Sequence, residues 1–186
     1  MLDDIRKKID EIDNSMKPLF LERLLWSEKV AEEKAKTKGE VYIPEREKEI
    51  IEKRSEDIEG EKRESYCVFL EDLMQNSGTY QYGILKGWQE EVLKNCLKNA
   101  ELTGEESHSK VAVGFRCGKK DFGLCMHMAY LNHVVISSAS ATEEGEDLNC
   151  KLVLEGTTRD ETIKRLICQW EKETEGFEIK ELFGSV

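Results

Sequence analysis

A stripe of apolar residues near the N-terminus predicts a single helix of about 35 residues, and this length limits how the chain can fold. Between residues 4 and 38 apolar side chains recur at intervals of three and four, as on one face of an amphipathic helix. They are Ile5, Ile9, Ile12, Met16, Leu19, Phe20, Leu24, Val30 and Ala31. Such a helix spans roughly 50 Å, more than a small domain can cover alone. The sequence therefore predicts a long partner for this helix, or a second chain.

Proline and glycine divide the rest of the first half into further helices. Pro18 predicts a kink between residues 14 and 18, because a proline inside a helix removes a backbone hydrogen bond at a cost of about 3 kcal/mol. Lys38 and Gly39 end the first helix, and Pro44 suits the first turn of the next. Further helices are expected over residues 44–54, 64–85 and 88–97, and a polar linker over 99–109.

The second half of the chain has the pattern of an α+β domain. Thr158 and Glu161 have the spacing of a capping box that opens a helix. Strands are expected at residues 111–115, 134–136, 152–154 and 177–182, and helices at 122–131 and 160–173. The order βαββαβ is that of the ferredoxin-like fold. The predicted organisation is an all-helical domain over 1–98, a linker over 99–109 and an α+β domain over 110–186.

Charge and composition argue against several classes of protein. The chain has 28 Lys and Arg against 39 Asp and Glu, a net charge of −11, and no basic stripe, which argues against binding to nucleic acid. No uncharged apolar run reaches the roughly 18 residues of a membrane span, and the N-terminus is too polar for a signal peptide. We therefore expect a cytoplasmic protein that does not bind membranes.

The cysteines do not predict a metal site. The chain has 6 cysteines and no CxxC pair, so we expect reduced thiols, several of them buried. Cys125 and His127 form a CxH pattern, with His133 nearby, but this is half of a zinc site at most.

In so acidic a chain, basic residues among apolar neighbours are the informative candidates for a binding site. Arg23 and Lys34 are separated by about 20° around an ideal helix and about 16 Å along it, so they lie on one face and could bracket a small anion. Arg46 and Glu47 place opposite charges side by side in the next helix. Taken singly, these residues are better explained by surface salt bridges with the abundant glutamates than by a binding site.

Taken together, the polar positions of the first half resemble those of a known family. Ser77 and Gln81 add a hydroxyl and an amide at i and i+4 of a later helix. The segments LDDIRKKIDEID, LERLLWSEKVAEEK, YIPEREKEI and LEDLMQNSGTYQ resemble, in order and spacing, the all-helical chorismate mutases over residues 1–86. The matched positions are Arg6, Arg23, Lys34, Arg46, Glu47, Ser77 and Gln81.

This resemblance implies a homodimer of interlocked three-helix protomers and an isomerase that converts chorismate to prephenate in aromatic amino-acid biosynthesis. The reaction needs no cofactor, which agrees with the lack of a Ser/His/Asp set and of a phosphate-binding glycine loop. The implied clamps on the two substrate carboxylates are Arg23 and, from the partner chain, Arg6. Lys34 and Gln81 would donate to the ether oxygen, Glu47 would accept from the ring hydroxyl, and Arg46, Ser77 and the backbone of Ile43 would complete the substrate contacts.

The second half resembles the small amino-acid-binding ACT domains in its strand order and in the ending EIKELFGS. An aromatic amino acid, phenylalanine or tyrosine, is the implied effector. The candidate effector site is the turn Asp121, Phe122, Gly123 and Leu124, where free N–H groups at a helix N-terminus can hold a carboxylate. The alternative is a domain that only adds dimer interface.

Two departures from the mutase pattern leave other functions open. Ile43 stands where the family usually has an acidic residue, and Pro18 lies between Arg6 and Arg23. One alternative is a non-catalytic, amino-acid-binding regulatory protein with a decayed mutase pocket. A further alternative does not depend on these departures: a related enzyme that acts on isochorismate or an amino analogue of chorismate, because the same cationic pocket would suit those substrates.

Overall fold

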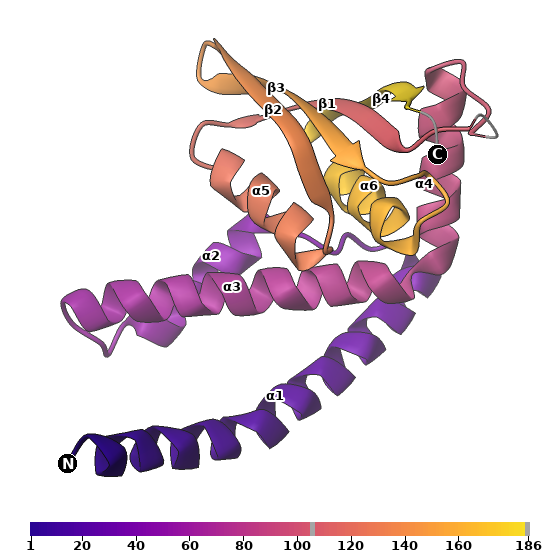
Figure 1. The fold of residues 1–186 in the computed structure, drawn as a ribbon. Coiled ribbons are helices and arrows are strands. Elements are labelled where there is room, and N and C mark those ends of the chain that lie inside the picture. Colours follow the sequence, from indigo (N-terminus) through magenta and orange to yellow (C-terminus); the bar gives the residue numbers. More distant parts are fainter. Residues whose placement is uncertain (105–106, 185–186) are drawn as a thin grey trace.

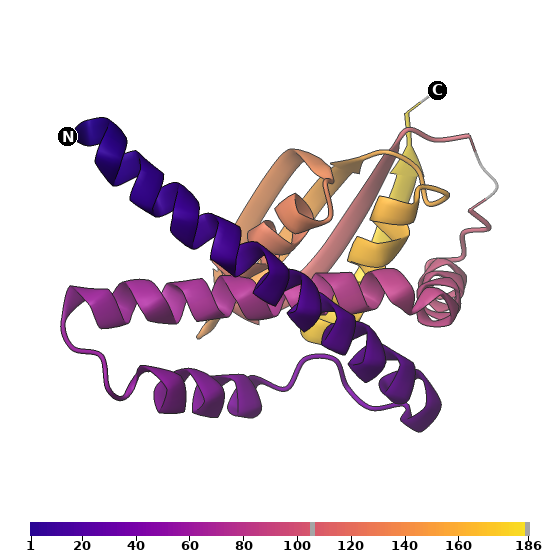
Figure 2. The same cartoon turned by 90° about the horizontal axis from the view of Figure 1, so that it is seen from below.

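The first half of the chain is all-helical, as predicted. The computed structural model describes residues 1–104 and 107–184. The helices are α1 (Leu2–Thr37), α2 (Pro44–Ser55), α3 (Glu61–Ile84) and α4 (Lys86–Asn99). The backbone of Lys38 is left-handed (φ 55°) and ends α1, and Pro44 occupies the first turn of α2. α1 crosses α3, and α2 runs beside α3 (Figure 2).

Pro18, at which the sequence predicts a kink, lies inside α1 and does not interrupt the helix. The helix is continuous from Leu2 to Thr37, and Figure 1 shows it as a curved rod that bends away from α3 toward its N-terminus. Residues 1–22, which include the N-terminal half of α1, are all exposed in the protomer.

The apolar face of α1 is largely exposed in a single protomer. Only Ser27 and Ala31 are buried on this helix. Five residues on successive turns, the α1 apolar stripe, are each 44–66% exposed: Ile5, Ile9, Ile12, Met16 and Leu19. Exposed apolar surface of this extent and regularity is typical of an interaction face.

The second half forms a four-stranded antiparallel sheet, which confirms the predicted βαββαβ order. Its elements are β1 (Lys110–Gly118), α5 (Phe122–Leu131), β2 (Val135–Glu144), β3 (Asp147–Glu155), α6 (Glu161–Glu173) and β4 (Glu175–Phe183). The strand order is β2-β3-β1-β4, and Val113 of the central strand β1 lies opposite Leu152 of β3 and Ile179 of β4. This arrangement is consistent with an ACT-like domain.

Both halves share one hydrophobic core. α5 and α6 cover the face of the sheet that is turned toward α3 (Figure 1), and α4 packs along α6. Trp170 of α6 is fully buried between Phe115 of β1 and Phe177 of β4, and its indole N–H donates to the Cys125 carbonyl (3.2 Å). The core continues from these residues to α4 and to Tyr82 at the end of α3.

The predicted capping box at the start of α6 is wrong. Asp160 occupies the N-cap position, and its carboxylate accepts the Thr157 N–H (2.7 Å). Thr158 is buried instead, and its backbone N–H donates to His108 Nε2 (2.9 Å). The hydroxyl of Thr158 also contacts the buried side chain of His108, which is distant in sequence. The local spacing of Thr158 and Glu161 does not reveal this partner.

Parts of the predicted organisation fall on positions that are not described. Residues 105–106 of the predicted linker 99–109, and residues 185–186 at the end of the predicted domain 110–186, lie outside the described residues. All 6 cysteines are free thiols and all except Cys67 are buried, as expected. None of the helices within the described ranges is long and apolar enough to span a membrane.

Substitution of Ile163 by valine is expected to lower the free energy of unfolding by about 0.5–1.5 kcal/mol, because the lost methylene leaves a small cavity in a close-packed core. Ile163 is 1% exposed on the inner face of α6. Urea unfolding followed by circular dichroism measures the change. Val135→Ala is the control, since Val135 is 59% exposed and a surface change should stay within about 0.5 kcal/mol. Equal urea midpoints for Ile163→Val and the parent would contradict this account of the core.

Candidate active site

Arg23 joins α1 to α3. Its guanidinium donates to the Leu73 carbonyl (3.3 Å) and to the Ser77 hydroxyl. Arg23 is half-buried, and desolvation lowers its pKa, with a smaller lowering by Arg54 and a raising by Glu47. A second α1–α3 contact lies one helical turn along, where the Tyr80 hydroxyl donates to the Glu28 carboxylate (2.5 Å). The side chain of Arg23 is thus fixed with its charge directed between the helices.

Lys34 lies at the other end of the same α1 face, as the spacing predicted. Its ammonium donates to the carbonyl of Val41 (3.0 Å) in the connection between α1 and α2. Desolvation lowers the pKa of Lys34, and Arg46 lowers it further, whereas Glu47 and Glu173 raise it. Arg46 and Glu47, at the start of α2, are therefore close enough to Lys34 to act on its charge.

Glu47 is the acidic member of this group. Its pKa is raised by desolvation, and the neighbouring Lys34 and Arg23 partly offset this rise. Arg46, the adjacent residue, is exposed. Three helices therefore bring together five predicted positions, which we call the helical site: Arg23, Lys34, Arg46, Glu47 and Ser77.

Gln81 follows Ser77 by one helical turn of α3. It is 8% exposed, and its amide oxygen is buried without a hydrogen-bond partner among the described residues. An unpaired buried acceptor is unfavourable. The amide is consequently not held by the protein through its oxygen, and it can turn toward a bound molecule.

Two predicted residues lie differently from the others. Arg6 is 66% exposed near the start of α1 and pairs with Asp3 (3.5 Å). It lies about 25 Å along the helix from Arg23, so it does not belong to the helical site of its own protomer. Ile43 is the N-cap of α2, and its carbonyl accepts the Glu47 N–H (3.1 Å), so the backbone at this position helps to orient Glu47.

A cavity of about 670 Å³ lies between the helical half and the sheet half. Glu47 and Tyr42 line it from the first half, and Glu173 lines it from the end of α6. Burial raises the pKa of Tyr42 to about 12 and that of Glu173 to about 8. Glu47 therefore borders both the helical site and this cavity.

Sequence reasoning did not find Glu173. An acidic side chain in the last turn of a helix opposes the helix dipole, which is the one local signal that it carries. Its position near the helical site depends on how α6 packs against α3, and no sequence motif predicts that packing.

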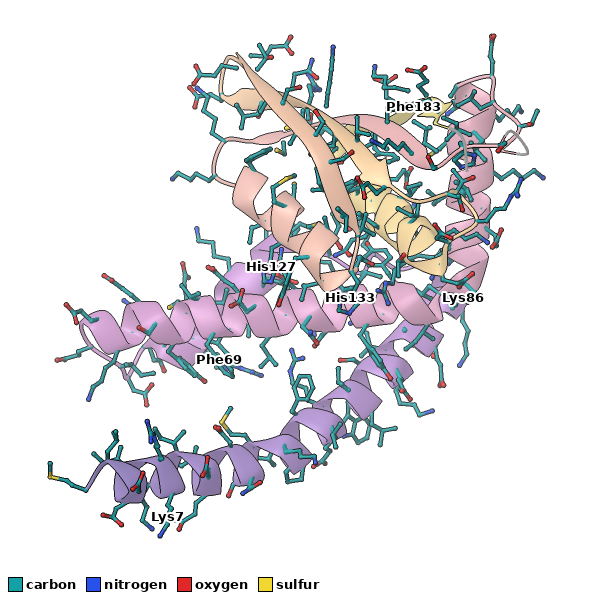
Figure 3. All side chains as sticks on the ribbon, viewed as in Figure 1. Lys7, Phe69, Lys86, His127, His133 and Phe183 are labelled. Carbon is teal, nitrogen blue, oxygen red and sulfur yellow. The ribbon has the colours of Figure 1, made fainter. Side chains whose placement is uncertain are left out.

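The predicted effector residues lie at the start of α5, beside the same cavity. Asp121 and Leu124 line the cavity, and the Leu124 carbonyl accepts from the side chain of Gln75 on α3 (3.5 Å). Phe122 packs against the core, and Gly123 is exposed with open space around it. Figure 3 shows His127 between α5 and α3, where it contacts Asp72 (3.5 Å). The start of α5 thus faces the helical half rather than solvent alone.

Comparison with known proteins matched part of the chain to a described family. Residues 5–82 match the family described as chorismate mutase type II. The matched segment contains every residue of the helical site together with Arg6 and Gln81, whereas Glu173 lies outside it. No curated protein and no solved structure matched the chain.

Proposed function

We propose that this protein is a chorismate mutase, a cytoplasmic isomerase that rearranges chorismate to prephenate in the synthesis of phenylalanine and tyrosine. The observation that carries the proposal is the convergence of Arg23, Lys34 and Glu47 from two helices within the segment that matches the mutase family. The proposed mutase domain covers residues 1–98, the linker 99–109 and the regulatory domain 110–186.

The arrangement suits a rearrangement that needs no covalent intermediate. Chorismate carries two carboxylates, and bidentate arginines can hold it in a compact reactive conformation. Arg23 would bind one carboxylate, and Arg6 of the partner subunit would bind the other. Arg46 and Ser77 would complete these contacts, and the backbone of Ile43 would orient the substrate beside Glu47.

Charge stabilisation would supply the rest of the catalysis. As the C–O bond breaks, the ether oxygen becomes more negative, so donors directed at it stabilise the transition state more than the ground state. Lys34 and Gln81 are the proposed donors, and Glu47 would accept a hydrogen bond from the ring hydroxyl. The partial burial of Lys34 and Glu47 strengthens such interactions, because water screens them less.

The proposed active unit is a homodimer. The α1 apolar stripe has no partner within the described part of the protomer, and a second copy of the same stripe is complementary in length and polarity. Two α1 helices packed along each other would bury both stripes and bring Arg6 of each chain toward the site of the other. The curvature of α1 around Pro18 would influence how the two helices align. A different alignment would change how far Arg6 reaches into the site of the other chain.

The second half is proposed to regulate the first. Two of the four residues of the candidate effector site, Asp121 and Leu124, line the cavity that Glu47 also borders. A phenylalanine or tyrosine bound there would act on Glu47 through a shared wall.

Turnover of chorismate by the purified full chain tests the proposal. We expect loss of chorismate absorbance with prephenate as the product, and a shift of the rate on addition of phenylalanine or tyrosine but not tryptophan. Isochorismate and aminochorismate are assayed in parallel. Faster turnover of either compound than of chorismate would show that this compound, and not chorismate, is the preferred substrate. No turnover of any of the three, with the amino acids still bound in calorimetry, would instead support a non-catalytic regulatory protein.

A further inference from the structure

Glu173 is held in a defined position at the end of α6. The Tyr82 hydroxyl donates to its carboxyl group, and Gln169 Nε2 donates to Oε1 (3.5 Å). The amide of Gln169 is itself fixed, because its oxygen accepts from the Thr79 hydroxyl (3.1 Å) and from Asn132 Nδ2 (3.0 Å). With the oxygen of Gln169 occupied by two donors, its NH2 group is directed at Glu173.

The charged neighbours of Glu173 belong to the helical site. Lys34 of α1 and Glu47 of α2 both act on it electrostatically, and Tyr42 is close enough to respond to its charge. Cys168, on α6 itself, also responds to that charge. The sheet half therefore places one carboxyl group in the wall of the cavity that Glu47 also lines. Lys34 is bonded to the carbonyl of Val41, another residue of this wall, and acts on the charge of Glu173.

Other charged groups line the remaining walls of the cavity. Arg116 of β1 is paired with Glu175 of β4 (2.9 Å), and Asp121 lies at the start of α5. The other charged lining residues are Lys48 and Glu52 of α2, Glu71 of α3 and Asp147 of β3. Arg116 already has a carboxylate partner, so it does not provide a free counter-charge for Glu173.

We propose that Glu173 is a positioning residue of the mutase site: its protonated form leaves the Lys34 ammonium available to the substrate, and its ionised form competes with the substrate for that ammonium. This inference rests on the proposed function. It makes the end of α6 a wall of the mutase site, although α6 lies outside the segment that matches the mutase family.

The protonation state of Glu173 changes in an accessible pH range. Burial raises its pKa to about 8, although the hydrogen bonds from Tyr82 and Gln169 lower it. Glu173 is therefore mainly neutral at pH 7 and ionised at pH 9. An added negative charge beside Lys34 opposes the binding of a dianionic substrate, so the effect should fall on KM more than on kcat.

The pH profile of kcat/KM tests the proposal with the full chain. In the parent we expect a decrease of about tenfold between pH 7 and pH 9, equivalent to about 1.4 kcal/mol, with a midpoint near pH 8 and carried mainly by KM. In Glu173→Gln, which resembles the neutral carboxyl in shape, this decrease should vanish, and a fall should remain only at the higher pH where Lys34 loses its proton.

A second variant shifts the transition rather than removing it. Tyr82→Phe removes the hydroxyl that stabilises the ionised carboxylate, so the midpoint should move to higher pH. Glu178→Gln removes a charge from the exposed face of β4 and should keep the parent profile.

The outcomes separate this proposal from the proposed function. Parent protein without turnover at any pH would overturn the mutase function and this role with it. An active parent whose KM profile is unchanged in both Glu173→Gln and Tyr82→Phe would overturn the role of Glu173 alone.

Discussion

Replacing Lys34 with alanine is expected to lower kcat by about 10² to 10³ while the protein remains folded and dimeric. In the proposed mechanism this substitution removes one preorganised donor to the ether oxygen, which gains negative charge in the transition state. Lys34 is partly buried with Arg46 and Glu47 as charged neighbours, so water does not readily replace its ammonium. Steady-state assays with chorismate measure the change in kcat. The oligomeric state of each protein is measured under the same conditions.

Lys36→Ala is the matched control for this substitution. Lys36 lies on the same helix, but it is 71% exposed and pairs with Glu33 on the helix surface (3.4 Å). It should keep the parent rate within experimental error. Parent-like turnover in Lys34→Ala would refute the role of Lys34 as a donor.

If the proposed dimer forms, replacing Ile9 with aspartate is expected to dissociate it and to abolish most of the proposed turnover. Ile9 lies in the middle of the α1 apolar stripe and is 52% exposed in one protomer. In a symmetric dimer the change places two carboxylates in an apolar interface, and about 2 kcal/mol for each raises the dimer Kd about 10³-fold. Sedimentation or light scattering over a dilution series measures this change.

Loss of the dimer should also remove the second carboxylate clamp. Arg6 and Arg23 lie about 25 Å apart along one α1, so a monomer cannot use both on one substrate. Asn14→Asp adds the same charge at an exposed polar position of α1 and should leave the dimer intact. A dimeric Ile9→Asp protein with full turnover would contradict the proposed packing of α1 against its copy.

The elements with strong local patterns were predictable. The spacing of apolar residues located α1, and Pro44 located the start of α2, because both depend on the chain within one or two helical turns. The strand β2 was predicted only over residues 134–136, whereas it extends from Val135 to Glu144. Most of its residues are exposed and polar, so the strand is defined by pairing with β3 rather than by its own pattern.

The positions of the helical site were also predictable, because they too depend on local spacing along helices. Arg23, Lys34 and Ser77 lie on helices, so their spacing in the sequence fixes which helix face each side chain occupies. The approach of Glu173 could not be predicted, because it arises from the packing of α6 on α3 through Tyr82 and Gln169, which are distant from each other in sequence. The wrong capping box at Thr158 has the same origin in a non-local partner, His108.

The exposed stripe of α1 also affects how the protein is made. During translation α1 leaves the ribosome before α3 has been synthesised, and its apolar stripe stays exposed even when the protomer has folded, so these side chains meet water from the start. A neighbouring nascent chain on the same messenger RNA presents an identical stripe at high local concentration. Assembly on the ribosome would protect this helix from aggregation and from holdase chaperones, and the two subunits of one dimer would then come from one polysome.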